Sequence, residues 1–187
     1  MRLTEPDPRF HRSYLAAFDE FVAAGEDRHA GLPSFGAPPY TDAEPLGHGF
    51  TRKAVAEPEG FAALVDLVRR VADPGSPRPR GYVPWTELWM AEGDEYLGRI
   101  TLRHELTEAL FTWGGHIGYV VRPSARRQGH ASAALQGIMP LCRERGIDPV
   151  LVTCDVDNDP SRRTIEGAGG VYEDTREGKL RYWIPTS

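Results

Sequence analysis

The most restrictive feature of this sequence is a change of hydrophobic period between residues 115 and 154. Apolar side chains alternate along residues 115–121, which predicts a strand. They then recur every three or four positions along residues 131–142, which predicts an amphipathic helix. Residues 150–154 form a nearly continuous apolar run, which is typical of a buried central strand. A strand, a helix and a second strand in this order predict a helix packed on a sheet.

Shorter segments on both sides of this unit extend the predicted sheet. They comprise two strands joined by a hairpin turn, a short helix that begins at a proline, and two closing strands: residues 86–91, 96–104, 160–167, 171–172 and 180–184. Hairpins combined with a strand–helix–strand unit predict an α/β (α+β) fold with a mixed sheet flanked by helices.

The first 80 residues differ from the rest, because they are predicted to be helix and loop. Apolar stripes predict helices at residues 14–22 and 61–71, and residues 30–51 are predicted to be an irregular loop. Residues 73–81, dense in Pro and Gly, come nearest to a linker. At 187 residues the chain favours one domain over two, so we expect a single domain.

Composition excludes several classes of protein. With 22 Lys and Arg against 27 Asp and Glu, the net charge of −5 argues against a non-specific nucleic-acid binder. No apolar run approaches the roughly 18–20 residues of a membrane span, and residues 1–8 contain no apolar signal segment. Two cysteines, Cys142 and Cys154, are too few for a disulfide framework and lack zinc-ligand spacing. We therefore expect a cytoplasmic protein without a metal and without a membrane or nucleic-acid partner.

The loop between the strand at 115–121 and the following helix predicts an anion site. It reads Arg122-Pro123-Ser124-Ala125-Arg126-Arg127-Gln128-Gly129-His130-Ala131-Ser132. The first N–H groups of a helix lack partners inside it and, with the helix dipole, favour a phosphate. Gly129 allows a phosphate to approach the backbone. Residues 116–145 contain five Arg and one Glu, a local charge of +4 in an acidic chain, which favours a localised anionic ligand.

The spacing Arg126-x-x-Gly129-x-Ala131 is similar to the pyrophosphate loop of the GNAT N-acetyltransferase superfamily, whose pattern is Arg/Gln-x-x-Gly-x-Gly/Ala. The segment from Asn158 to Gly170 resembles that family's second signature. There an Asn follows a strand, a small residue comes three positions later, and a helix ends at a glycine. The resemblance covers about residues 84–185. It implies a mostly antiparallel central sheet, the acyl-CoA N-acyltransferase fold, with an acetyl-CoA-binding core.

The resemblance also implies an activity, which is acetyl transfer from acetyl-CoA to an amine by direct attack in a ternary complex. Backbone groups of the strand end would meet the pantetheine arm and the acetyl carbonyl, loop N–H groups would hold the pyrophosphate, and the second signature would contact the cofactor near its arm. The residues that this assigns to the cofactor are Tyr119, Val120, Val121, Arg126, Arg127, Gln128, Gly129, His130, Ala131, Ser132, Asn158 and Ser161.

A proton acceptor is useful in such a reaction, because an alkylamine with a pKa of about 10.4 is mostly protonated at neutral pH. Family members often carry a Glu where this chain has His116, and a His can serve as a base near neutrality. The alternative is that His116 is only a polar residue at a strand start. Glu105, Glu108 and Asp155 are further candidates for the base, and the place of His104 is undecided.

Two positions depart from the family pattern or from a regular helix. The family's general acid is a Tyr where this chain has Ile165, so thiolate departs unaided or another group protonates it. Tyr172 is a possible substitute for that acid, although core packing is the favoured role for it.

Pro140 lies inside the predicted helix and is expected to kink it. Cys154 is interpreted as a buried small residue rather than an acyl carrier.

These residues do not identify the acceptor amine, which is a small molecule or a protein. The alternative function is a non-catalytic acyl-CoA-binding sensor or interaction module, which Ile165 and the missing Glu favour and His116 opposes. A homodimer that pairs through the last strand, residues 180–184, is a further possibility. The acceptor cleft is expected between residues 36–50 and the sheet.

Overall fold

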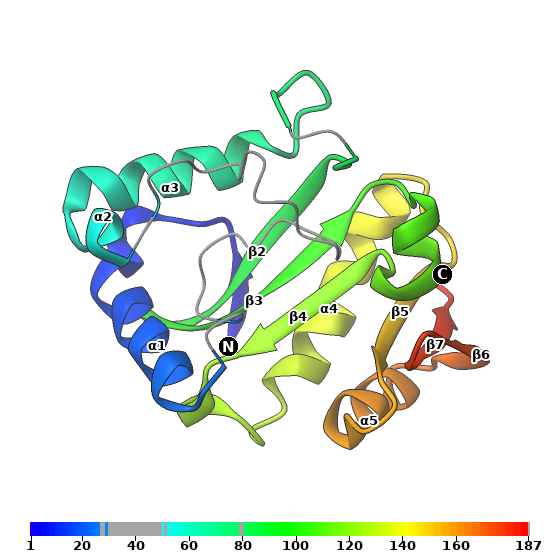
Figure 1. The fold of residues 1–187 in the computed structure, drawn as a ribbon. Coiled ribbons are helices and arrows are strands. Elements are labelled where there is room, and N and C mark those ends of the chain that lie inside the picture. Colours follow the sequence, from blue (N-terminus) through cyan, green and yellow to red (C-terminus); the bar gives the residue numbers. More distant parts are fainter. Residues whose placement is uncertain (27–28, 30–49, 51, 79–80, 187) are drawn as a thin grey trace.

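A computed structural model describes residues 1–26, 29, 50, 52–78 and 81–186, so the expected acceptor loop at 36–50 lies outside the described residues except for Phe50. The described chain is built on one seven-stranded sheet in the order β1-β2-β3-β4-β5-β7-β6 (Figure 1). The strands are β1 Arg2–Thr4, β2 Trp85–Glu92, β3 Glu95–Arg103, β4 Ile117–Val121, β5 Val150–Asp155, β6 Val171–Arg176 and β7 Lys179–Ile184. All neighbouring strands are antiparallel except β4 and β5.

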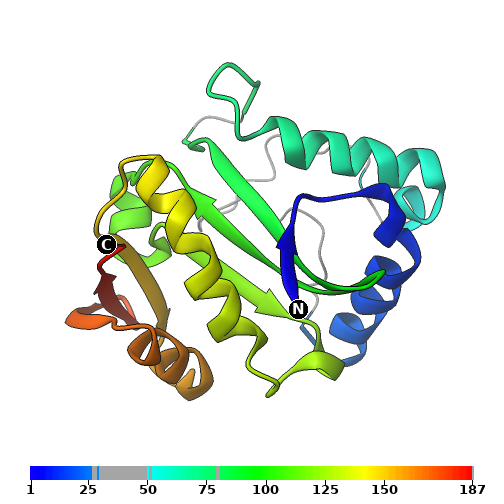
Figure 2. The ribbon, with the colours of Figure 1, turned by 180° about the vertical axis from the view of Figure 1, so that it is seen from behind.

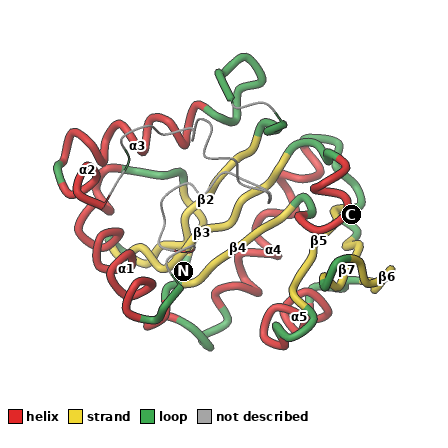
Figure 3. The backbone as a smooth tube through the Cα atoms, in the orientation of Figure 1, coloured by secondary structure: helices red, strands yellow, loops and turns green. Residues whose placement is uncertain are grey.

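Helices cover both faces of this sheet. They are α1 His11–Ala23, α2 Arg52–Ala56, α3 Pro58–Arg70, α4 His130–Glu144 and α5 Asp159–Gly167, with a short π-helical turn, η3, at Leu110–Gly114. Helix α4 lies on the face seen in Figure 2, over β3 and β4. Helices α1 and α3 pack on the opposite face near β2 and β3, which is the face seen in Figures 1 and 3. The two helical layers enclose two separate apolar cores.

Most of the elements expected from hydrophobic period are confirmed, including both N-terminal helices, the hairpin of β2 and β3, α4, the buried β5 and the last two strands. Strand β1 is an addition, because three residues at an edge carry too little pattern to predict. Helix α4 continues through Pro140 to Glu144. Within the described residues, no helix is both long and apolar enough to cross a bilayer.

The expected dimer contact through residues 180–184 is not supported by the topology. Strand β7 lies between β5 and β6, so both of its backbone edges are already hydrogen-bonded within the chain. The free edges of the sheet belong to β1 and β6 instead.

The parallel contact between β4 and β5 is very short. One pair of residues, Ile117 and Val152, is in register, and the two strands diverge beyond it. At the closed end the backbone N–H of His116 donates to the Leu151 carbonyl at 2.7 Å. The sheet therefore contains an opening, bounded by residues 118–121 on β4 and 153–155 on β5.

The far end of β4 is fixed to α1 by the buried guanidinium of Arg122, which is 9% exposed. It donates to Glu20 at 2.5 and 3.1 Å and reaches Glu95 at 3.3 Å. It also donates to the Ser13 hydroxyl and to the Tyr96 carbonyl, both at 3.2 Å. Arg122 thus joins the end of β4, helix α1 and the β2–β3 hairpin at one point.

Replacing Arg122 by Met should lower the free energy of unfolding by about 3 kcal/mol, because a buried charge network loses its cation. Urea denaturation measures this loss. The matched control is Arg52→Met, since the Arg52–Asp19 pair is exposed on both sides and should contribute less than about 1 kcal/mol. Equal losses in the two variants would contradict the role assigned to Arg122.

Candidate functional site

Strand β4 turns alternate backbone groups toward the opening. The Arg122 N–H donates to the Leu97 carbonyl at 2.8 Å, so Arg122, Val120 and Gly118 direct their backbone groups to β3. The N–H groups of Tyr119 and Val121 therefore face the opening. Val120 was expected to meet the cofactor through its backbone. Its backbone N–H and carbonyl are directed to β3 instead, so only its side chain is available to a cofactor.

The loop after β4 provides a run of free backbone donors. The first hydrogen bond at the start of α4 runs from the Ala133 N–H to the Gly129 carbonyl at 3.0 Å. Within the described part of the chain, the N–H groups of residues 127–132 have no hydrogen-bond acceptor. Arg127 (φ +63°) and Gly129 (φ +80°) are left-handed, a conformation that turns successive N–H groups toward one concavity. This arrangement suits a phosphate group.

The positive charge of the region is smaller than the sequence indicates. Arg126 forms a bidentate ion pair with Glu26 at 2.6 and 2.8 Å, and its Nε donates to the Val121 carbonyl. Hydrogen bonding to Glu26 raises the pKa of Arg126. Arg122 is neutralised by the carboxylates described above. Arg127 is exposed and forms no ion pair with the described residues, so the backbone and Arg127 are what the loop offers an anion.

The two residues expected from the second signature lie at the start of α5, on the other side of the opening. Asn158 caps this helix, because its Oδ1 accepts the Ser161 N–H at 3.1 Å. The Ser161 hydroxyl is 2.8 Å from the Tyr119 hydroxyl, so a hydrogen bond joins α5 to β4. Burial raises the pKa of Tyr119. The structure thus brings Tyr119, Ser161 and Asn158 together.

His116 lies buried at the closed end of the opening. Its Nδ1 accepts the Leu151 N–H at 2.9 Å, and because a backbone N–H can only donate, the ring proton of the neutral form is on Nε2. Burial, with a further contribution from the charge of Arg103, lowers the pKa of His116 to about 4. A neutral imidazole in this tautomer has no free lone pair for a substrate proton. The geometry favours the interpretation of His116 as a structural residue over the interpretation as a base.

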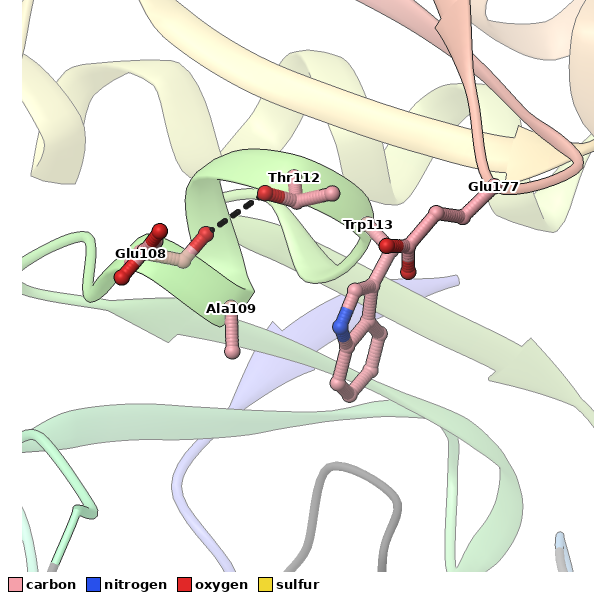
Figure 4. Close-up of a pocket in the computed structure, with 5 residues that line it drawn as sticks. All are labelled: Glu108, Ala109, Thr112, Trp113 and Glu177. Carbon is pink, nitrogen blue, oxygen red and sulfur yellow. Dashed lines mark hydrogen bonds between the residues drawn. The ribbon is translucent and has the colours of Figure 1, made fainter.

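The other proposed bases are spread over this region. Glu105 and Glu108 are exposed, and Asp155, at the end of β5, is ion-paired with Lys179. Glu108 lines an open pocket of about 260 Å³ between η3 and the β6–β7 turn, together with Ala109, Thr112, Trp113 and Glu177 (Figure 4). The Trp113 indole lies beside the Glu177 carboxylate there, a lining that suits a cation.

The structure also places the three residues that the sequence analysis discussed for thiolate protonation or acyl transfer: Ile165 at the position of the family's Tyr, Tyr172 and Cys154. Ile165 is fully buried. Tyr172 was expected in the core, which is wrong: it is 52% exposed on the edge strand β6, and its hydroxyl bonds Thr175 at 2.8 Å. Cys154 is buried as expected, and burial raises the pKa of its thiol, which disfavours a nucleophilic thiolate.

Sequence reasoning did not single out Arg103. Its Nη1 donates to the carbonyls of Gly114 and Gly115 at 2.9 and 3.0 Å, and its Nη2 lies 3.6 Å from the position of a Cβ at Gly118. Burial lowers the pKa of Arg103 to about 10. Arg103 also forms no ion pair with a described carboxylate. The sequence signal that could have indicated Arg103 is a positively charged residue within a strand whose side chains alternate between apolar and polar.

Among the described residues, no three His, Cys, Asp or Glu side chains form a group that could hold a metal ion.

Comparisons with known proteins agree with this geometry. Residues 39–171 match the family model described as an acetyltransferase (GNAT) domain. No curated protein sequence matches the chain significantly.

Solved structures share the fold at low sequence identity. The microcin C7 self-immunity acetyltransferase MccE, solved with acetyl-CoA and AMP, is 11% identical, with a TM-score of 0.59 over 98% of this chain and 91% of that one. The ribosomal L7/L12 α-N-protein acetyltransferase RimL, solved with coenzyme A, is 17% identical, with a TM-score of 0.57 over 99% and 94%. Mycobacterium smegmatis RimJ, solved with a CoA disulfide, is 20% identical, with a TM-score of 0.56 over 94% and 78%.

Replacing His116 by Asn tests its structural role, because Asn Oδ1 can accept the Leu151 N–H but does not titrate. The folded-state pKa of His116, about 4, lies below the unfolded value of about 6.5. Its contribution to stability is therefore complete above pH 6.5 and lost as pH falls toward 4, by at most about 3 kcal/mol. Denaturation curves between pH 7 and 4 should show a smaller acid loss in the variant.

His104, whose pKa burial also lowers to about 4, is present in both proteins, so the difference between them reports His116. Turnover should survive the change. Identical pH dependence of stability combined with a 100-fold loss of kcat would restore His116 as the base.

Proposed function

This chain belongs to the GNAT family of acetyltransferases, and we propose that it binds acetyl-CoA across the opening between β4 and β5. The observation that carries the assignment is the run of N–H groups at residues 127–132, at the end of that opening, which have no acceptor among the described residues. The pyrophosphate would bind these donors together with Arg127, a cation of the same loop that forms no ion pair with a described residue.

The pantetheine arm would then run along β4. The Tyr119 and Val121 N–H groups face the opening and are the donors that an acetyl carbonyl would meet there. As the amine attacks, negative charge develops on that carbonyl oxygen. A fixed N–H donor stabilises this charge in the transition state by about 3–4 kcal/mol.

The amine attacks directly in a complex that holds both substrates, so no acyl-enzyme is needed. Cys154 is buried with a raised thiol pKa, which argues against an acyl-cysteine. A thiol with a pKa of about 8.5 is a fair leaving group near neutral pH, so the buried Ile165 at the position of the family's Tyr does not block the reaction.

We also propose that residues 1–187 form one domain. Helix α1 supports this, because it is tied to the cofactor loop through Glu20, which accepts the Ser124 N–H and hydroxyl at 3.0 and 2.9 Å. Burial raises the pKa of Glu20, but its hydrogen bonds from Arg122 and Ser124 outweigh that and lower it overall. A cytoplasmic location is proposed from the two cysteines, which are both free thiols.

Replacing Gly129 by Val should weaken acetyl-CoA binding at least tenfold, about 1.4 kcal/mol. Gly129 is left-handed (φ +80°), so a β-branched residue strains the loop and places a side chain at the phosphate site. The control is Gly169→Val: Gly169 has φ +85°, and a Cβ at either glycine meets no atom within 4 Å. Both variants should lose similar stability.

Isothermal titration calorimetry with acetyl-CoA separates the two glycines. Only Gly129→Val should lose affinity, because Gly169 lies between α5 and β6, away from the loop. Unchanged affinity in Gly129→Val, or an equal loss in both variants, would remove the proposed cofactor site.

A further inference from the structure

We infer that Glu87, acting through the Thr101 hydroxyl, receives the proton that the acceptor amine loses. This inference rests on the proposed acetyl transfer and assigns it a proton path on the sheet face opposite α4. Neither residue belongs to the sequence motifs described above.

Three residues form a row across the sheet. Glu87 on β2 is in register with Thr101 on β3, and Thr101 is in register with Gly118 on β4. Residues in register on neighbouring strands lie on the same face, at a strand spacing of about 4.8 Å. The row therefore runs from Glu87 to the edge of the opening over about 10 Å.

The face on which this row lies follows from its neighbours. Ile100 and Leu102, on either side of Thr101, belong to the core beneath α4. Alternation along the strand therefore turns Thr101 to the opposite face. Glu87 points to that face too, because it accepts a hydrogen bond from Nε1 of Trp89, a residue of the core beneath α1 and α3.

Gly118 leaves room at the end of the row. It precedes Tyr119, whose N–H faces the opening, so the acetyl carbon would lie beside it. Among the described residues, a Cβ at Gly118 would meet only the Arg103 guanidinium, at 3.6 and 3.8 Å. Arg103 places a positive charge beside this space, which disfavours the ammonium form of an amine and favours the nucleophilic free base.

The hydrogen-bond direction along the row suits proton transfer away from the amine. Thr101 lies directly across from Glu87 in the strand pair, and its hydroxyl lowers the pKa of that carboxylate; because a carboxylate only accepts, the Thr101 hydroxyl would direct its one proton toward Glu87. The lone pairs of Thr101 Oγ1 are left to accept a proton from an amine above Gly118. Thr101 is half-buried, so the space beside it is reachable.

The surroundings of Glu87 suit a proton acceptor that works near neutral pH. Its side chain is 12% exposed, with Arg99 on β3 at 3.8 Å and the hydroxyls of Tyr14 and Tyr96 nearby. Burial raises the pKa of Glu87, although Arg99 and the hydrogen bonds from Trp89 and Thr101 oppose it. A carboxylate with a raised pKa is a stronger base than an exposed one.

The step balances without a further reactant. The amine nitrogen bonds the acetyl carbon, and the carbon–sulfur bond breaks with its electron pair leaving on the CoA thiolate. The proton lost by nitrogen goes to Thr101 Oγ1 as the Thr101 proton goes to Glu87. The products are the amide, the thiolate and a protonated Glu87, which returns its proton to the thiolate or to water.

The test measures CoA release from acetyl-CoA with hydroxylamine as the acceptor probe, because its nitrogen is mostly unprotonated at neutral pH. Glu87→Gln and Thr101→Val should each lower kcat/KM by roughly 10²–10⁴. Thr101→Ser keeps the hydroxyl and should retain most activity. The double variant Glu87→Gln with Thr101→Val should be no worse than either single variant, because both interrupt one path.

The pH profile separates this role from a structural one. The rate of the parent protein should rise with pH as Glu87 loses its proton and then level off, and both single variants should lose that rise. Thr101→Val keeps the Glu87–Arg99 pair, so it remains informative if Glu87→Gln is unstable. Glu92→Gln, an exposed carboxamide change at the end of β2, is the matched control and should leave turnover unchanged.

Acetyl-CoA binding, measured by calorimetry, should be unchanged in every variant. Parent-like turnover and pH dependence in Thr101→Val would overturn the inference and leave acetyl transfer standing. A parent protein that binds acetyl-CoA but releases no CoA with hydroxylamine would overturn the transfer function and this inference with it. A parent protein that does not bind acetyl-CoA would overturn the cofactor site first.

Discussion

The short parallel pairing of β4 with β5 is the constraint on which the rest of the site depends. One residue pair is in register, and His116 closes that end with its backbone N–H and its ring Nδ1, both bonded to Leu151. Beyond this point the strands separate, and β4 keeps only its β3 partner. Because a strand turns alternate backbone groups to each side, the separation leaves the Tyr119 and Val121 donors facing an opening rather than a neighbour.

The other end of β4 is held by electrostatics, and this changes what the basic loop can do. Arg122 and Arg126 look like part of a phosphate-binding patch, yet each is bound to a carboxylate from α1 or the residues just after it. These two ion pairs hold the loop against the N-terminal helix and the residues that follow it. Backbone N–H groups, which stay oriented without a counterion, would bind the proposed anion together with Arg127.

The two faces of the sheet carry different parts of the proposed reaction. The face beneath α4 and α5 carries Tyr119 and Ser161 beside the opening, where the cofactor would bind. The opposite face carries the row of Glu87, Thr101 and Gly118, where the acceptor would lose its proton. A mixed sheet that opens between two central strands would give the two proposed substrates access to one carbonyl carbon from opposite sides.

The sequence alone predicted most of the elements and the loop proposed to bind the cofactor. Period-two and period-3.6 patterns report which residues face a core, and a glycine in a basic loop between strand and helix reports a helix N-terminus open to an anion. The proton path was not predictable in this way. His116 was a candidate base because of its type and place, but its Nδ1 is committed to the Leu151 N–H, a residue 35 positions away.

Glu87 and Thr101 carried no local signal, since a Glu and a Thr on a hairpin strand are ordinary solvent-facing residues. Strand register placed them in one row with Gly118, and the contact with Trp89, a residue of the core beneath α1 and α3, leaves the Glu87 side chain 12% exposed. Tertiary structure likewise decided which arginines are free, because an ion pair depends on which carboxylates the fold brings within about 4 Å, and neither Glu20 nor Glu26 lies near its arginine in the chain. Local pattern indicated most of the elements, and contacts between distant residues decided which side chains are free to take part in the proposed chemistry.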